Sequence, residues 1–195
     1  MIACILLSAG LSTRFGSPKA LAKLNGRTVI EYVLQTLIDS KLDQIIVVLG
    51  AQADEIKAHI LKHKKVKVVY NKDYNLGQTS SFKAGLEALQ GESGIMLLPV
   101  DLPCIKKETI DQLIDQFLAQ KPKILIPTYQ QKRGHPPLFA SNFKELFLGM
   151  DNLTGINSLE HQHESEIVFF PVDDPGIAKS FNTQEEFNAI RESCR

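Results

Sequence analysis

The loop from Ser8 to Lys19 combines small residues with two cations, and this combination suits an anionic ligand. Small side chains let backbone N–H groups approach an anion, and Arg14 and Lys19 can both meet phosphate oxygens. The loop spans twelve residues, whereas a connection between a strand and a helix usually has about two to six, and long loops are commonly functional. The loop therefore predicts a site for a phosphorylated ligand.

Two common phosphate-binding motifs do not fit the spacing of this loop. A dinucleotide fingerprint needs G-x-G-x-x-G, but the second residue after Gly10 is Ser12. A P-loop needs four residues between its glycines and then a lysine, whereas Gly10 and Gly16 are separated by five residues and a serine follows. The spacing favours neither a Rossmann dehydrogenase nor a Walker ATPase.

Asp101 follows an apolar run at positions 95–98 that lacks polar alternation, as expected of a strand buried on both faces of a sheet. Ligands of open α/β sheets lie beyond the carboxyl ends of the strands, so Asp101 is expected to face a crevice. An isolated carboxylate is costly there unless a cation compensates it, and Mg²⁺ commonly binds one or two carboxylates plus substrate phosphates. Asp101 is therefore a candidate Mg²⁺ ligand; alternatively, it caps the turn into Pro103 or the following helix.

A second polar segment begins at Gly77. The glycine suits a tight turn, and the hydroxyls of the next residues, together with helix N-terminal amides, suit a polar ligand. The alternative is that a hydroxyl simply caps the helix expected to follow. The residues concerned are Thr79, Ser80 and Ser81.

Short apolar runs alternate with amphipathic stretches of helical length, which predicts strands joined by helices. This repetition is typical of an α/β fold, with a mainly parallel sheet covered on both faces, and we expect one domain over residues 1–195. The segment 127–139, punctuated by glycine and proline, is expected to form a hairpin outside the main sheet. The expected strands are 2–7, 44–49, 66–70, 94–99, 123–126 and 167–170, and the expected helices are 29–39, 53–61, 80–89, 106–119, 142–147 and 183–190.

The composition argues against several classes of partner. The 22 lysines and arginines balance the 22 aspartates and glutamates, so we expect no nucleic-acid partner. No run approaches the roughly 18 apolar residues of a membrane-spanning helix, so we expect no membrane association. The cysteines Cys4, Cys104 and Cys194 lie far apart and form no C-x-x-C pair, which favours a reducing compartment and a cytoplasmic location.

Positions 7–19 read L-x-x-G-x-S-x-R-x-G-x-x-K and resemble the signature loop of the MobA-like nucleotidyltransferases. The resemblance implies a three-layer α/β/α, Rossmann-like nucleotidyltransferase fold with a mainly parallel mixed sheet. It also implies an enzyme that transfers a nucleoside monophosphate from a nucleoside triphosphate to a phosphorylated acceptor and releases pyrophosphate. The chain is most similar to the molybdenum cofactor cytidylyltransferases, which implies CTP, Mg²⁺ and molybdopterin. It further implies a molybdoenzyme or chaperone as a protein partner.

Other segments match the same group in the same order. Positions 77–86 are similar to its G-x-S-x-S-x-x-x-G-L segment beside the base and ribose, positions 101–103 to its aspartate-x-proline motif, and positions 133–139 to its R-G-H-P-x-x-F segment on the acceptor side. The implied catalytic residues are Arg14, Lys19 and Asp101. The implied nucleotide contacts are Leu7, Ser8, Ala9, Gly10, Ser12, Arg14, Lys19, Gly77, Gln78, Thr79, Ser80, Ser81 and Asp101. The implied acceptor contacts are Arg133, Gly134 and His135, and the implied metal ligands are Asp101 and Asn182.

Three positions depart from the family pattern or divide its members. Asn182 stands where an aspartate is usual, although the guanylyl-transferring members also have asparagine, and a neutral amide is a weaker Mg²⁺ ligand. The segment 155–158 lacks the arginine of a G-A-R motif, which leaves the acceptor open. Ala9 stands where guanylyl members tend to have glycine, which favours CTP over GTP. The alternatives are a guanylyl- or sugar-phosphate nucleotidyltransferase and a catalytically inactive nucleotide-binding regulatory module.

Overall fold

The computed structural model describes residues 1–192 and 194, and within them eight strands form one main sheet. These strands are β1 (Ile2–Ser8), β4 (Gln44–Leu49), β5 (Val66–Tyr70), β6 (Gly94–Pro99), β7 (Ile124–Tyr129), β8 (Lys132–Arg133), β9 (Leu138–Ala140) and β10 (Ile167–Pro171). Their order is β10-β7-β9-β6-β1-β4-β5, with β8 paired to β7. Only the pairs made by β8 and β9 are antiparallel, so the predicted mainly parallel mixed sheet is confirmed.

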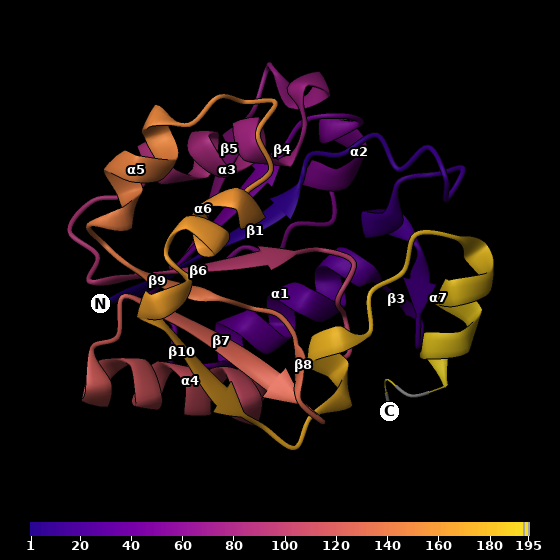
Figure 1. Cartoon of the computed structure of the whole chain (residues 1–195). Helices are drawn as coiled ribbons and strands as arrows, with labels where there is room; N and C mark the ends of the chain where they lie inside the picture. The colour runs from indigo at the N-terminus through magenta and orange to yellow at the C-terminus, as the bar shows by residue number, and fades with distance from the viewer. Residues whose placement is uncertain (193, 195) are drawn as a thin grey trace.

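Helices cover both faces of this sheet and produce the predicted α/β/α layers (Figure 1). The helices are α1 (Val29–Asp39), α2 (Ala53–Lys57), α3 (Gln78–Glu87), α4 (Lys107–Gln120), α5 (Phe143–Gly149), α6 (Asn157–Gln162) and α7 (Gln184–Arg191). In β1, Cys4 and Leu6 pack into the core that contains α1, α4 and α7, whereas Ile5 and Leu7 pack into the core that contains α3, α5 and α6. The strand is apolar on both sides because neither face of the sheet meets solvent.

Smaller elements complete the chain. A two-stranded hairpin consists of β2 (Lys23–Leu24) and β3 (Arg27–Thr28). The 3-10 turns are η1 (Lys19–Leu21), η2 (Tyr74–Leu76), η3 (Glu164–Glu166) and η4 (Pro175–Ala178). Among the described residues, no helix is both long and apolar enough to cross a membrane.

The segment 127–139 differs from the expectation of a hairpin outside the main sheet. β8 does form a hairpin with β7, but β9 enters the sheet between β6 and β7 and pairs antiparallel with both. Leu138 and Phe139 are fully buried there, which gives the physical reason for the insertion. A strand of three residues is too short to show a period in the sequence. Helix α6, with six residues, is likewise too short for its periodicity to be recognised in the sequence. Helix α2 is shorter than expected, since it ends at Lys57 rather than at position 61.

The cysteines also differ from the expectation of unpaired thiols. Cys104 and Cys194 form a disulfide, with their Cα atoms 4.8 Å apart, although 90 positions separate them in the sequence. Cys4 is unpaired, and burial raises the pKa of its thiol. The disulfide joins the end of the chain to the loop after β6, and sequence spacing gave no sign of this contact.

Reduction of this disulfide is expected to lower the free energy of unfolding by about 2–4 kcal/mol, because an open chain has more conformational freedom when unfolded. Urea unfolding followed by circular dichroism, with and without reductant, measures the change. The Cys194→Ser variant serves as control, since its midpoint should not respond to reductant. An identical midpoint for the wild-type protein in both conditions would contradict the pairing.

Candidate functional site

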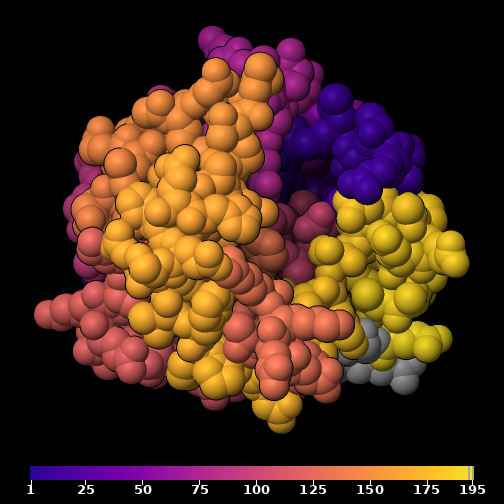
Figure 2. Space-filling view, in the orientation of Figure 1, coloured from indigo at the N-terminus to yellow at the C-terminus, as the bar shows by residue number. Residues whose placement is uncertain are grey.

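A cavity of about 370 Å³ opens at the carboxyl ends of β1 and β6, where Leu7 pairs with Pro99. Figure 2 shows this face of the molecule hollowed where the indigo N-terminal segment, an orange segment and the yellow C-terminal segment meet. This cavity, which we call the first pocket, has the size of a small-ligand site. Its wall includes the predicted residues Leu7, Ser8, Ala9, Gly10, Ser12, Arg14, Lys19, Gly77, Gln78, Ser81, Asp101 and Asn182.

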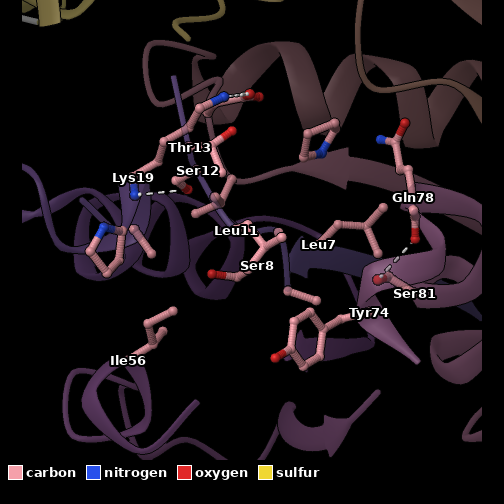
Figure 3. A pocket seen from close by; sticks show the side chains of 18 of the residues that line it. Leu7, Ser8, Leu11, Ser12, Thr13, Lys19, Ile56, Tyr74, Gln78 and Ser81 are labelled. Carbon is pink, nitrogen blue, oxygen red and sulfur yellow. Dashed lines mark hydrogen bonds and ion pairs between the residues drawn. The ribbon is translucent and has the colours of Figure 1, made fainter. Parts of the chain in front are cut away.

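The two predicted loops face each other across the first pocket. Figure 3 shows Ser12 and Lys19 on one side and Gln78 and Ser81 on the other, with Ser8 between them. The hydroxyl oxygen of Ser8 is buried and has no hydrogen-bond partner among the described residues. A buried hydroxyl without a partner is costly, so a ligand that bonds to it would remove that cost.

Lys19 and Asp101 form an ion pair in the first pocket, with 2.7 Å between Nζ and Oδ2. Their side chains are only 14% and 19% exposed, so the attraction is screened less than on an open surface. Asn182 Oδ1 accepts hydrogen bonds from Lys19 Nζ and Arg14, both at 2.9 Å. The structure thus brings together four residues from three parts of the chain that lie far apart in the sequence.

A buried carboxylate fixes the loop that carries Asp101. Asp174 is 1% exposed and accepts hydrogen bonds from the backbone of Lys106 at 2.9 Å and the hydroxyl of Thr109 at 2.7 Å. The Phe181 amide donates to the carbonyl of Asp101 at 3.3 Å. The segment 172–182 therefore holds the loop of Asp101 by hydrogen bonds and places Asn182 where Lys19 contacts both residues.

The donor set suits a metal that also binds substrate phosphates. Among the described residues, no group of three histidines, cysteines or acids could hold a metal ion by itself. Asp101 meets Lys19 through Oδ2, which leaves Oδ1 for a cation. Asn182 Oδ1 already accepts two hydrogen bonds from cations and is a poor ligand in this arrangement. One carboxylate plus phosphate oxygens is a common environment for Mg²⁺.

Two of the hydroxyls implied as nucleotide contacts lie outside the wall of the first pocket. Thr79 donates to the carbonyl of Thr154 at 2.6 Å. Ser80 donates to the carbonyls of Asp73 and Gly77 at 2.8 and 2.9 Å. These hydroxyls therefore hold backbone in place, as in the capping alternative.

The wall also contains residues that the sequence did not predict, among them Ile56, Tyr74 and Asn75. Tyr74 packs directly against the backbone of Gly50. A side chain at position 50 would prevent this contact, because its Cβ would lie 2.6 Å from the Cβ of Tyr74. The sequence signal for Tyr74 is an aromatic residue three positions before Gly77, and such a residue alone does not indicate a ligand contact.

The predicted acceptor residues line a second cavity, of about 320 Å³, which we call the second pocket. His135 lies there with Nδ1 buried and without a hydrogen-bond partner among the described residues. Burial lowers the pKa of His135, and the charge of Asp101 opposes that change. The two pockets are thus close enough to interact electrostatically. Gly134 is required by packing, since a Cβ there would lie 2.6 Å from Ile177.

The fold and the first pocket define a Rossmann-like α/β protein with a polar cavity beyond the carboxyl ends of its parallel strands. Residues 4–167 match the model of the MobA-like NTP transferase domain, and the chain belongs to this family.

Two curated relatives match about two thirds to three quarters of this chain. The chain is 30% identical over 141 residues to the nicotine blue oxidoreductase of Paenarthrobacter nicotinovorans, a match that covers 68% of this chain and 67% of the relative. It is 31% identical over 147 residues to a probable molybdenum cofactor guanylyltransferase of Bacillus cytotoxicus, covering 74% and 70%. Among solved structures, Rv0371c of Mycobacterium tuberculosis H37Rv in complex with manganese matches with a TM-score of 0.82 and 24% identity over 98% of both chains, which shows a shared fold.

Proposed function

We propose that this chain transfers CMP from CTP to a phosphorylated acceptor of the molybdopterin type and releases pyrophosphate. The observation that carries the proposal is the cluster of Arg14, Lys19 and Asp101 in a cavity of nucleotide size. Membership of the MobA-like family supports nucleotidyl transfer. Ala9 in the wall of the first pocket supports CTP, because guanylyl-transferring relatives tend to have glycine at that place.

The first pocket would hold the nucleotide. The small residues Ala9 and Gly10 leave space beside the backbone, and a Cβ at Gly10 would meet no described atom within 4 Å. Helix α3 begins at Gln78 in the pocket wall, and its free N-terminal amides would donate hydrogen bonds to the base and ribose. The phosphates would then meet Arg14 and Lys19 on the opposite side.

In the reaction, an oxygen of the acceptor phosphate attacks the α-phosphorus of CTP. A new phosphorus–oxygen bond forms, and the bond from the α-phosphorus to the bridging oxygen of pyrophosphate breaks. Two anions must approach each other, so alignment and charge compensation are the main contributions of the protein. Lys19 would stabilise the charge that builds on the leaving pyrophosphate. Asp101 would hold Mg²⁺, which supplies further positive charge to the phosphates.

A pyrophosphate-release screen tests the proposal. The four nucleoside triphosphates are crossed with molybdopterin and a sugar phosphate, in the presence of Mg²⁺ or Mn²⁺, since a solved structure of similar fold contains manganese. We expect release with CTP and molybdopterin and loss of release on addition of a chelator. Pyrophosphate release with GTP instead of CTP would show that GTP is the donor. Release with the sugar phosphate instead of molybdopterin would show that the acceptor is a sugar phosphate. Nucleotide binding without release in any combination would favour an inactive binding module.

A further inference from the structure

The second pocket contains polar side chains that sequence reasoning did not assign to the site. Helix α6 contributes three of them, and its carboxylate Glu160 lies on the same cavity wall as Arg133 and His135. The cavity is lined by Ile126, Arg133, Gly134, His135, Pro137, Asn157, Glu160 and His161. The pocket therefore offers an acid, an amide and imidazoles together with the predicted guanidinium.

Glu160 is the only carboxylate among the described residues that line the second pocket. Burial raises the pKa of Glu160, and the positive charges of Arg133 and His161 act in the opposite direction, so these neighbours favour its ionised form. The carboxylate is thus partly desolvated and lies near positive charge contributed by the protein.

Arg133 is itself oriented by contacts outside this wall. Its guanidinium donates to Glu164 at 3.0 Å and stacks over the Phe169 ring at 4.8 Å from the centroid. A fixed guanidinium suits a phosphate group. In the second pocket, the Arg133 guanidinium therefore suits a phosphate group. Separately, the Glu160 carboxylate can only accept hydrogen bonds when it is ionised.

We propose that Glu160 selects the acceptor by accepting two parallel hydrogen bonds from an amino group and an adjacent ring N–H, the edge that a pterin presents. The inference rests on the proposed function and adds the chemical group that the enzyme recognises. An ionised carboxylate accepts hydrogen bonds only, and its two oxygens match a pair of neighbouring donors. A cationic acceptor is disfavoured, because Arg133 already supplies positive charge near the carboxylate.

The test compares the KM for molybdopterin in CTP-dependent pyrophosphate release by the wild-type protein and by Glu160→Gln. The variant keeps the size of the side chain but replaces one acceptor oxygen with a donor. We expect the acceptor KM to rise roughly ten- to a hundredfold, the usual cost of losing a hydrogen bond to a charged group. The KM for CTP should stay within about twofold, because Glu160 does not line the first pocket.

The control is Glu145→Gln, which alters an exposed glutamate on α5 outside both pockets and should leave both KM values unchanged. Free pterin should compete with the acceptor better than lumazine, in which oxygen replaces the amino group, and Glu160→Gln should remove this preference. An unchanged acceptor KM in a folded Glu160→Gln variant would overturn the inference alone. Absence of pyrophosphate release by the wild-type protein would instead overturn the proposed function on which it rests.

Discussion

Replacement of Lys19 by alanine is expected to lower kcat by roughly a hundred- to a thousandfold, the usual effect of removing one donor that stabilises charge in a transition state. Lys19 Nζ lies 2.7 Å from Asp101 and 2.9 Å from Asn182 in the first pocket. In the proposed reaction, this ammonium would stabilise the charge that develops on the leaving pyrophosphate. The KM for CTP should change less than kcat, because that charge develops mainly as the bond breaks.

Steady-state measurement of pyrophosphate release gives kcat and KM for this variant. Lys23→Ala is the matched control, since Lys23 is an exposed lysine on the neighbouring strand β2 and does not line the pocket. Circular dichroism and the melting temperature establish that both variants fold. If Lys19→Ala folds and retains its turnover, the assignment of the phosphates to this side of the pocket is wrong.

Replacement of Asp101 by asparagine is expected to lower kcat by about a thousandfold and to remove the dependence on divalent metal. Loss of several kcal/mol of metal-derived stabilisation corresponds to a factor of this order. Asparagine retains an oxygen that can accept the hydrogen bond from Lys19. The decrease in kcat therefore measures the effect of the negative charge of Asp101 rather than of this hydrogen bond alone. The local fold should persist, because the backbone of Asp101 is held by Phe181 through its carbonyl.

Calorimetric titration separates the metal role from a structural one. Mg²⁺ should tighten CTP binding to the wild-type protein but leave CTP binding to Asp101→Asn almost unchanged. Asp173→Asn provides the control, because Asp173 is exposed and does not line the first pocket. An equal gain in CTP affinity from Mg²⁺ in Asp101→Asn would show that the metal is held by other groups.

The first pocket could be predicted from the sequence because its residues follow recognisable strands. The loop after β1 and Asp101 after β6 must meet, since neighbouring parallel strands end at the same edge of the sheet. The pairing of Lys19 with Asp101 could not be read from the sequence, and neither could the engagement of Asn182 by two cations. Those contacts depend on side-chain positions that no spacing rule specifies.

The second pocket was less predictable because short elements and distant contacts build it. Glu160 lies on a six-residue helix, which is too short to give a clear periodicity. The sequence predicts His135 on the acceptor side, but the burial of its Nδ1 depends on packing around η4. The disulfide between Cys104 and Cys194 also could not be predicted, because 90 positions separate the two cysteines and only the fold brings them together.

Under the proposed function, the insertion of β9 between β6 and β7 would separate the two substrates. The strand β6 leads to Asp101, whereas β7 and its hairpin partner β8 lead to Arg133. Neighbouring strands lie about 4.8 Å apart, so two spacings separate β6 from β7 by roughly 10 Å. This separation is set by backbone hydrogen bonds of the sheet. Under the proposed function, side chains in either pocket could therefore be exchanged to alter substrate preference without a change in the distance between donor and acceptor.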